Sequence, residues 1–219
     1  MIIAIDGPAA SGKSVTAKDV AKKLKYIHIN TGSMYRAVTL YFLEKKVNLD
    51  NGTIFKKELK KLKINFNFKN EIFINDIDVS NKLRQDSVNN NVSKVSAVKV
   101  VRDNLVALQR NIALDNNVVM EGRDIGTTVF PNADFKFYLT ADIEVRAKRR
   151  LIENQKSEND IQSMIDQIKK RDNLDKKRKH SPLVVADGAI IIDTTNMKIA
   201  DQVEKIVNII KRKDKYTNE

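Results

Sequence analysis

The chain contains no cysteine and no tryptophan, and its 219 residues include only seven glycines and three prolines. Without cysteine there is no disulfide, no thiolate metal site and no thiol nucleophile, which is compatible with the cytoplasm. No apolar run is long enough to span a bilayer, and no internal repeat or Gly/Ser/Pro-rich linker divides the chain. The N-terminal apolar stretch ends at Asp6 and follows no basic segment, so we expect no secretory signal. We expect one cytoplasmic domain with an inserted lobe and no membrane partner.

Acidic residues are the minority charge: 28 Asp and Glu face 40 Lys and Arg, which gives a formal net charge of +12. A basic chain suits polyanions such as nucleotides, nucleic acid or acidic membranes. Much of the lysine is spread along predicted helix faces, as it is through residues 56–63, which favours a solvated surface over a nucleic-acid patch. No regular alternation of basic and aromatic residues supports single-strand binding either. The charge therefore favours small anionic ligands over nucleic acid.

The segment Gly7–Ser14 reads GPAASGKS and matches the phosphate-binding loop pattern. Gly7 and Gly12 let the backbone curl, so that successive N–H groups can point at one phosphate. Lys13 brings positive charge to the β- and γ-phosphates, and the Ser14 hydroxyl can bind Mg²⁺. An apolar strand over residues 2–5 precedes the loop and a helical pattern follows it, whose N-terminal dipole adds to the site. This order favours nucleotide binding over a chance glycine turn.

Strand-like and helix-like segments alternate along the chain, which predicts a parallel sheet covered by helices on both faces. Ligands then bind at the carboxyl ends of the strands. One region breaks the alternation: residues 62–80 read as a small antiparallel insert, with Lys69 and Asn70 in a turn. The further strands are expected at Tyr26–Ile29, Val118–Met120, Phe135–Leu139 and Ala189–Ile192, and helices at Met34–Leu43, Val95–Ile112 and Ile199–Ile210.

Three further clusters carry chemistry. After the third expected strand, Arg123 can bind a phosphate, and Asp124 can accept a hydrogen bond from a base amino group or assist Mg²⁺. The alternative is that the charged residues at this strand end form a purely structural ion pair. After the second, Asn30 or Thr31 can cap a helix that carries Arg36, which alone is a weak signal. Late in the chain, two helix faces carry arginines. They are Arg146, Arg149 and Arg150 on one face, and Arg171 and Arg178 with Asp175 on the other.

Those arginine faces would ordinarily be solvated helix surface. Next to a nucleotide loop they are better explained as a closing lid, because phosphoryl transfer needs positive charge on the moving phosphate and exclusion of water. His28 and His180 have no visible partner in the sequence and stay unassigned.

Together these segments resemble the bacterial cytidylate kinases over nearly the whole chain. The likeness includes AIDGPAASGKS at Ala4–Ser14, TGSMYRA at Thr31–Ala37, EGRDIGT at Glu121–Thr127, RAKRR at Arg146–Arg150, RDNLDKKR at Arg171–Arg178, SPL at Ser181–Leu183 and DTT at Asp193–Thr195. The phosphate loop is shared by many families, whereas EGRDIGT and the spaced arginine–aspartate segment are specific. Asn30 stands where an aspartate is usual, and Ser33 where an alanine is usual.

The resemblance implies the P-loop kinase fold: an α/β parallel sheet flanked by helices, with a small antiparallel β insert and a helical lid. It implies a core of residues 1–54 and 92–219, an insert at about 55–91 on the monophosphate side, and a lid at about 146–178. The implied reaction moves the γ-phosphate of ATP, bound with Mg²⁺, to CMP or dCMP in pyrimidine nucleotide metabolism. The implied protein is a monomer whose partners are these nucleotides.

Residue roles follow from the same resemblance. ATP is expected at Gly7, Pro8, Ala9, Ala10, Ser11, Gly12, Lys13, Ser14 and Val15, with Ser14 as the Mg²⁺ ligand. The acceptor phosphate is expected at Arg36, Arg123 and Arg178, the cytosine edge at Ser93, Arg102 and Asp124, and the ribose at Arg171 and Asp175, with Thr31 also at the acceptor. Charge during transfer is expected from Lys13, Arg123, Arg146, Arg150 and Arg178.

Three alternatives stay open. The acceptor could be UMP, AMP or another small metabolite, because base choice rests on residues placed only by resemblance. A nucleotide-dependent RNA-binding or regulatory protein would bind ATP without transferring phosphate, and its RNA binding would depend steeply on salt. A structural relic of a P-loop protein would have no need of an intact Lys13 and Ser14.

Overall fold

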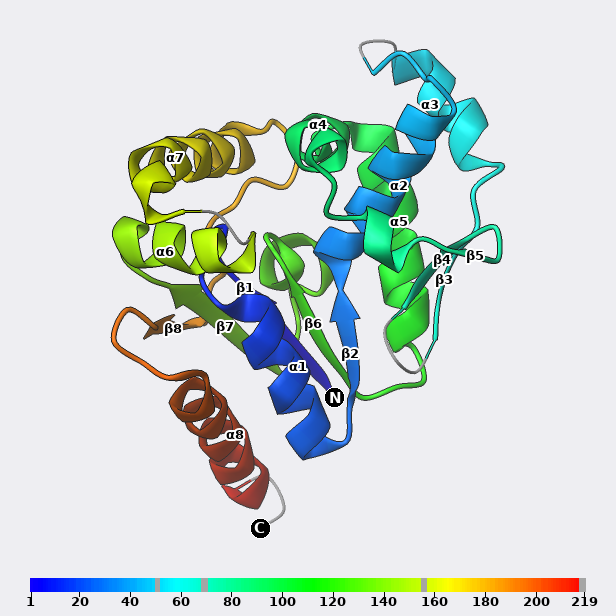
Figure 1. Cartoon of the computed structure of the whole chain (residues 1–219). Helices are drawn as coiled ribbons and strands as arrows, with labels where there is room; N and C mark the ends of the chain where they lie inside the picture. The colour runs from blue at the N-terminus through cyan, green and yellow to red at the C-terminus, as the bar shows by residue number, and fades with distance from the viewer. Residues whose placement is uncertain (50–51, 68–70, 155–156, 217–219) are drawn as a thin grey trace. The chain divides into compact units, whose positions relative to one another are not determined.

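The computed structural model describes residues 1–49, 52–67, 71–154 and 157–216, and the chain divides into two compact units (Figure 1). The first unit comprises Met1–Ile29, Asp115–Lys177 and Ser181–Glu219. The second comprises Asn30–Leu114 and Arg178–His180. Each unit has its own sheet and its own helices.

The first unit contains a five-stranded sheet in the order β2–β6–β1–β7–β8. β1 pairs in parallel with β6 on one side and with β7 on the other, and β7 pairs in parallel with β8. The near-continuous apolar run of β1 is explained by burial on both faces. The predicted parallel sheet is confirmed, with bounds of Ile2–Asp6 (β1), Ile27–Asn30 (β2), Val118–Gly122 (β6), Phe135–Thr140 (β7) and Ile190–Asp193 (β8).

Two pairs of helices complete the first unit. α1 (Lys13–Leu24) packs on α8 (Ile199–Tyr216), and both bury apolar side chains against the sheet in one core cluster that includes Ile5, Phe137 and Val203. α6 (Ile143–Glu153) lies beside α7 (Ile161–Lys177), which follows the short turn η3 (Glu158–Asp160). Across the described residues, none of the helices combines the length and the apolar character that a membrane span requires.

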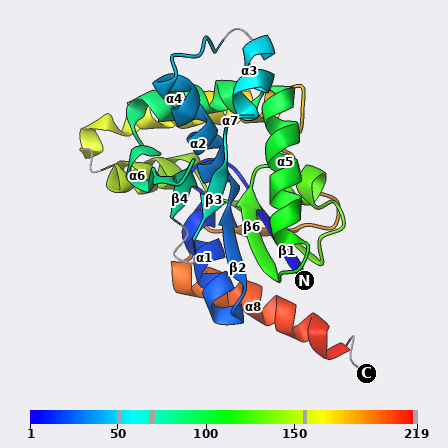
Figure 2. The ribbon, with the colours of Figure 1, turned by 90° about the vertical axis from the view of Figure 1, so that its right-hand side faces the viewer.

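The second unit contains the predicted antiparallel insert. β3 (Ile64–Phe66), β4 (Ile72–Ile74) and β5 (Ile77–Asp78) form a three-stranded antiparallel sheet, while the turn expected at Lys69 and Asn70 lies outside the described residues. Helix α2 (Thr31–Glu44) packs on β4. Its Phe42 stacks on Phe55 of α3 (Gly52–Leu59), with ring centroids 4.6 Å apart, and α3 packs on α5 (Lys99–Ala113) (Figure 2). The unit also contains η1 (Ser80–Lys82), α4 (Asp86–Ser96) and α5 (Lys99–Ala113).

The single helix predicted over Val95–Ile112 is wrong. α4 ends with Ala97 as its C-cap, and Val98 adopts an extended backbone (φ −78°, ψ 122°) as the N-cap of α5. The apolar spacing continues through the break, so periodicity alone did not reveal it. The predicted capping of the helix before Arg36 is confirmed, because Asn30 Oδ1 accepts the Ser33 N–H at 3.0 Å. The helix therefore begins at Thr31 rather than at Met34.

The carboxyl ends of β1, β6 and β7 meet at one end of the first unit's sheet. Strand register places Asp6 opposite Gly122 of β6 and opposite Tyr138 of β7. From β1 the chain enters the loop of residues 7–12, and soon after β6 it forms the single π-helical turn η2 (Ile125–Val129). The phosphate-loop motif and the Arg123–Asp124 motif therefore leave neighbouring strands.

Candidate functional site

The phosphate loop begins with a close approach that only glycine allows. Gly7 has φ +149°, and a Cβ placed on it would lie 2.1 Å from the carbonyl oxygen of Leu139 on β7. A side chain at this position would therefore force the loop away from the sheet. Gly12 forms the N-cap of α1, so the loop passes directly into the helix N-terminus. The sequence thus builds an anion-binding turn on the end of β1.

Lys13 is buried beneath this loop. Its ammonium donates to the Pro8 carbonyl oxygen at 2.6 Å and to Ser11 Oγ at 3.2 Å, and the residue is 5% exposed. Burial, and then the positive charge of Arg123, lower the pKa of Lys13 well below its ordinary value. A bound anion stabilises an ammonium that is buried close to another positive charge, and a phosphate group would be such an anion.

Ser14 is linked to two buried residues. Its hydroxyl donates to Glu121 Oε2 at 2.8 Å, and the other carboxylate oxygen lies 3.3 Å from Nε2 of His28. No partner of His28 could be predicted from the sequence, because the contact joins β2 to β6. Magnesium suits these donors, since it takes one or two protein oxygens and completes its shell with phosphates and water. Among the described residues there is no group of three or more His, Asp or Glu side chains that could hold a metal ion.

Arginine side chains gather around the loop. Arg123 Nε donates to Asp175 Oδ2 at 2.9 Å. Burial lowers the pKa of Arg171 to about 10, and the nearby charges of Arg123 and Arg150 add to that shift. The Nε of Arg171 is buried and has no hydrogen-bond partner within the described part of the chain. Several guanidinium groups brought this close together favour an anionic ligand.

Arg146 and Asp172 anchor the two late helices to the loop. Asp172 Oδ1 accepts the Ala9 N–H at 3.0 Å, and its other oxygen accepts Nη1 of Arg146. Arg146 also donates to the carbonyl oxygens of Ala9 and Ala141, at 3.2 and 3.0 Å. The sequence placed Arg146 at the donor phosphates but missed Asp172. In this structure the Arg146 guanidinium joins α6 to both α7 and the loop.

Arg149, expected on the arginine face of the lid but given no role by the resemblance, reaches the loop through Thr194. Its guanidinium donates to Oγ1 and to the carbonyl oxygen of Thr194, at 3.0 and 2.6 Å. The Thr194 hydroxyl in turn lies 3.2 Å from the Ser11 carbonyl oxygen. The i, i+3 spacing between Arg146 and Arg149 was the sequence feature that could have indicated a shared position for these two arginines. Arg150 is instead paired with Glu153 of its own helix, Nη1 to Oε2 2.7 Å.

Asp6, another residue that the motif reading missed, joins the loop to the Arg123–Asp124 segment. It is 4% exposed, and its two oxygens accept the N–H groups of Ile125 and Gly126 at 2.8 and 2.7 Å. Asp124, which directly precedes these amides, is also buried, at 3% exposed. In the first unit, therefore, the structure brings together the predicted loop, Arg123, Asp124, Arg146, Arg150, Arg171 and Asp175.

The other predicted residues belong to the second unit. Arg102 is 3% exposed, donates to the Ser96 carbonyl oxygen at 3.3 Å and lies over the Tyr35 ring at 5.4 Å from its centroid. Ser93 precedes Ser96 by one turn of α4, and its carbonyl oxygen accepts the Ser96 hydroxyl. Within this unit Ser93 and Arg102 are therefore linked through Ser96. Thr31 and Arg36 lie on α2, and Arg178 follows α7.

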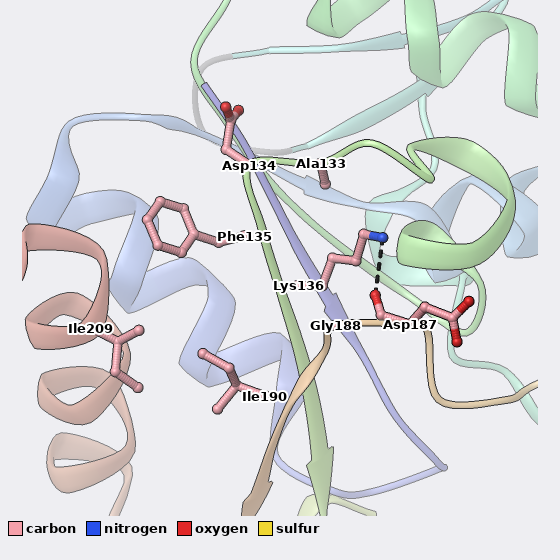
Figure 3. A pocket seen from close by; sticks show the side chains of 8 residues that line it. All are labelled: Ala133, Asp134, Phe135, Lys136, Asp187, Gly188, Ile190 and Ile209. Atoms are coloured by element: carbon pink, nitrogen blue, oxygen red, sulfur yellow. Dashed lines mark hydrogen bonds between the residues drawn. The ribbon is translucent and has the colours of Figure 1, made fainter. Parts of the chain in front are cut away.

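A pocket elsewhere in the first unit contains none of the predicted residues. It lies at the start of β7 and β8 (Figure 3) and is lined by Ala133, Asp134, Phe135, Lys136, Asp187, Gly188, Ile190 and Ile209. Its polar groups already bond to the backbone: Lys136 Nζ donates to the Asp187 carbonyl oxygen, and Asp134 accepts the Ile2 N–H. The chemistry of this unit is therefore concentrated at the loop.

Comparison with known proteins agrees with this geometry. The family model described as cytidylate kinase matches residues 3–212. A cytidylate kinase of Fusobacterium nucleatum is 47% identical over 97% of this chain and 96% of its own length. One from Clostridium botulinum (strain Langeland) is 48% identical over 96% of this chain and 97% of its own, and one from Caldanaerobacter subterraneus is 44% identical over 97% and 96%.

Solved structures support the fold alone. An uncharacterised protein from Eubacterium ventriosum aligns with a TM-score of 0.53 and 12% identity, covering 96% of this chain and 98% of its own. A Thermus thermophilus protein aligns with a TM-score of 0.52 and 13% identity, covering 97% of each chain. The order of helices and strands is therefore shared with proteins of very different sequence.

Proposed function

The chain belongs to the cytidylate kinase family, and from that premise we propose that it transfers the γ-phosphate of ATP to CMP or dCMP. The products are ADP and CDP or dCDP. The observation that carries this proposal is the buried Lys13 beneath a glycine-built loop, with Arg123 close enough to help lower the pKa of Lys13, and Arg171 in turn close to Arg123. That arrangement suits a reaction in which the protein supplies mainly position and charge.

The donor binds to the loop. Residues 7–15 surround the β- and γ-phosphates with backbone N–H groups, except at Pro8, and with the N-terminus of α1, and Lys13 adds positive charge. A magnesium ion held through Ser14 would supply positive charge to offset the charge that develops on the γ-phosphoryl group. The Ser14 oxygen would bind the ion through a lone pair while the Ser14 hydroxyl still donates its hydrogen bond to Glu121, which is present at 2.8 Å.

The acceptor is bound by arginine, aspartate, serine and threonine side chains. Arg36, Arg123 and Arg178 hold the phosphate of CMP, and Arg171 and Asp175 contact the ribose. Ser93, Arg102 and Asp124 read the cytosine edge, and Thr31 adds a hydroxyl. Support comes from the ion pair that orients Arg123 on Asp175 and from the burial of Arg102 and Asp124. Buried polar groups discriminate strongly between bases, because a wrong base leaves them without a partner.

Transfer is direct and in line. An oxygen of the acceptor phosphate attacks the γ-phosphorus, the bond from that phosphorus to the bridging oxygen breaks, and ADP leaves with the electron pair. The attacking oxygen is already ionised, so no general base is needed. Residues 146–178 act as a lid that excludes water, with Arg146 and Arg150 directed to the phosphates. The bond from Arg146 to the Ala9 carbonyl oxygen supports that placement.

The protein works as a cytoplasmic monomer in pyrimidine nucleotide metabolism. The absence of cysteine is compatible with that compartment. Light scattering coupled to gel filtration tests the oligomeric state: a mass near 24.9 kDa agrees, and twice that mass contradicts it.

The experiment that tests the activity measures ADP formation from Mg-ATP with CMP, dCMP, UMP and AMP in parallel at fixed salt. Rapid turnover with CMP and dCMP, and little with UMP or AMP, supports the proposal. Turnover with UMP or AMP alone changes the acceptor but keeps the reaction. If no acceptor stimulates ADP formation, kinase activity toward these acceptors is contradicted, and salt-dependent RNA binding becomes the next measurement.

Base choice has its own test. Replacing Asp124 with Ala should lower the preference for CMP over UMP by roughly 10- to 100-fold, because a buried acceptor of base hydrogen bonds is lost. The quantity to compare is the ratio of kcat/KM for the two acceptors. An unchanged ratio in an active variant would show that Asp124 does not read the base.

A further inference from the structure

The side chain of Asp6 is a buried carboxylate, and each of its two oxygens accepts a hydrogen bond from a backbone amide. Oδ1 accepts from Ile125 N at 2.8 Å and Oδ2 accepts from Gly126 N at 2.7 Å. An ionised carboxylate can make both bonds, since each oxygen only accepts. Once protonated, one oxygen carries a hydrogen, and one of the two bonds is weakened or lost.

The two amides belong to the start of η2, directly after Arg123 and Asp124. Asp124 has an unusual backbone conformation for a loop residue (φ −151°, ψ 27°), and its carbonyl oxygen accepts from Thr128 N and Val129 N of the same turn. The conformation of this turn therefore sets the direction in which Arg123 and Asp124 leave the sheet. Asp6 is the side chain that ties the turn to the strand that carries the phosphate loop.

We propose that Asp6 is a positioning residue for the acceptor nucleotide: its ionised carboxylate fixes the turn that aims Arg123 and Asp124. This inference rests on the proposed function, which assigns those two residues to the acceptor. Asp6 itself touches no substrate in this scheme. Its effect reaches the reaction through the orientation of Arg123 and Asp124, for which displacements of about 1 Å can cost 10²-fold in rate.

The surroundings of Asp6 place its ionisation in an accessible pH range. The pKa of Asp6 is raised from 3.8 to about 6, chiefly by burial and also by nearby Asp124, while the two amide bonds and Lys13 oppose the rise. Tyr138 on β7 also faces it, and Asp6 contributes to a raised pKa of that phenol. Positioning is therefore complete well above pH 6 and is lost as the pH falls through 6.

The test compares wild type with Asp6→Asn, whose amide imitates the protonated acid. At pH 8 we expect kcat/KM for CMP to fall roughly 10- to 100-fold, while ADP affinity measured by calorimetry stays within about twofold. Phosphate monoesters also titrate near pH 6, so the informative quantity is the ratio of wild type to variant at each pH. Substrate titration cancels in this ratio, which should fall about tenfold from pH 8 to pH 5 as wild-type Asp6 takes up its proton.

The matched control is Asp134→Asn. Asp134 also accepts a backbone amide, from Ile2 at 2.6 Å, but it is exposed and lies at the start of β7. The same chemical change there should leave kcat/KM near the wild-type value at every pH. A loss equal to that of Asp6→Asn would show that any disturbed β1 contact lowers activity, and the positioning role would be overturned.

A second measurement needs neither the variant nor activity. In ¹⁵N–¹H spectra of the wild-type protein without nucleotide, the amides of Ile125 and Gly126 should titrate together with a midpoint near pH 6. If the wild type forms no CDP, the proposed function fails, whatever the amides do. If the wild type is active but the amides show no common midpoint, or the ratio to Asp6→Asn is the same at pH 5 and pH 8, the positioning role of Asp6 is overturned.

Discussion

Two regions of the first unit use the same residue types in opposite surroundings. At the phosphate loop, Lys13 donates to a backbone carbonyl oxygen and Asp6 accepts backbone amides, and both side chains are buried. At the pocket beside the start of β7 and β8, Lys136 donates to a backbone carbonyl oxygen (Figure 3), and Asp134 accepts a backbone amide. There Asp134 is exposed and Lys136 is partly exposed.

The two regions differ in the free energy that is lost when their charged groups are buried. Charges in the low dielectric of the interior lose hydration, which shows at the loop as a raised pKa for Asp6 and a lowered pKa for Lys13. Fold stability alone does not require such an arrangement, since exposed residues make the same bonds at the pocket. A ligand that carries negative charge explains why the loop keeps a buried ammonium close to Arg123.

The largest expected effect separates the two lysines. Replacing Lys13 with Met keeps the aliphatic stem but removes the charge at the phosphates, and turnover should fall by about 10³-fold. Lys136→Met makes the same change at the pocket and should leave turnover within about twofold of wild type. Steady-state kinetics on both variants, with circular dichroism to confirm folding, make the comparison. Equal losses would mean that the loop has no special role.

The second-largest effect on activity is expected at Arg123. Arg123→Ala removes a guanidinium assigned to the acceptor and its ion pair with Asp175, and kcat/KM for CMP should fall about 10²- to 10³-fold. Arg212→Ala, on the exposed surface of α8, is the control and should behave as wild type. Near-normal turnover of a folded Arg123→Ala protein would remove Arg123 from the catalytic group.

Replacing one glycine in each region compares how much each substitution lowers the free energy of unfolding. Gly188→Ala at the pocket has a positive φ of +70° but open space around it, so about 1–2 kcal/mol should be lost. At Gly7 the clash with the Leu139 carbonyl oxygen adds to the strain, and overpacking of this kind costs a further 1–3 kcal/mol or so. Denaturant unfolding of both alanine variants measures the difference. A Gly7→Ala variant as stable as Gly188→Ala would show that the loop can move off the sheet freely.

The smallest expected effect is the pH dependence of stability. Because the pKa of Asp6 is raised from 3.8 to about 6, the folded chain holds this proton more tightly than the unfolded chain, and the contribution of Asp6 to stability falls as pH rises. Between pH 5 and pH 7 the free energy of unfolding of wild type, relative to Asp6→Asn, should fall by about 1 kcal/mol. A relative stability that rises over this interval would contradict the burial of an ionisable Asp6.

Much of the first unit could be predicted from local sequence. The apolar run before Asp6, the loop GPAASGKS and the helix after it follow one another so closely that strand, turn and helix are each indicated by their own residues. The small antiparallel sheet was also predictable, because Ile64 and Phe66 alternate with polar residues. Roles for Arg36, Ser93 and Arg102 came only from resemblance, since nothing near them in sequence indicates a base pocket.

What could not be predicted depends on contacts between distant segments. Asp6 meets Gly126, and Arg149 meets Thr194, across 120 and 45 residues. Nor did the sequence reveal the break between α4 and α5, because neither Gly nor Pro marks it and Val98 continues the apolar spacing. Tertiary packing decides such features: α4 packs on α2, while α5 also packs on α3.

The most direct measurement follows the label of [γ-³²P]ATP in a reaction with CMP and Mg²⁺. We predict that the wild type places the label in CDP and that Lys13→Met places almost none there. Label that appears only as inorganic phosphate, at a rate independent of CMP, would contradict transfer to a nucleotide and would leave the loop as the site of a hydrolase or an ATP-binding regulator.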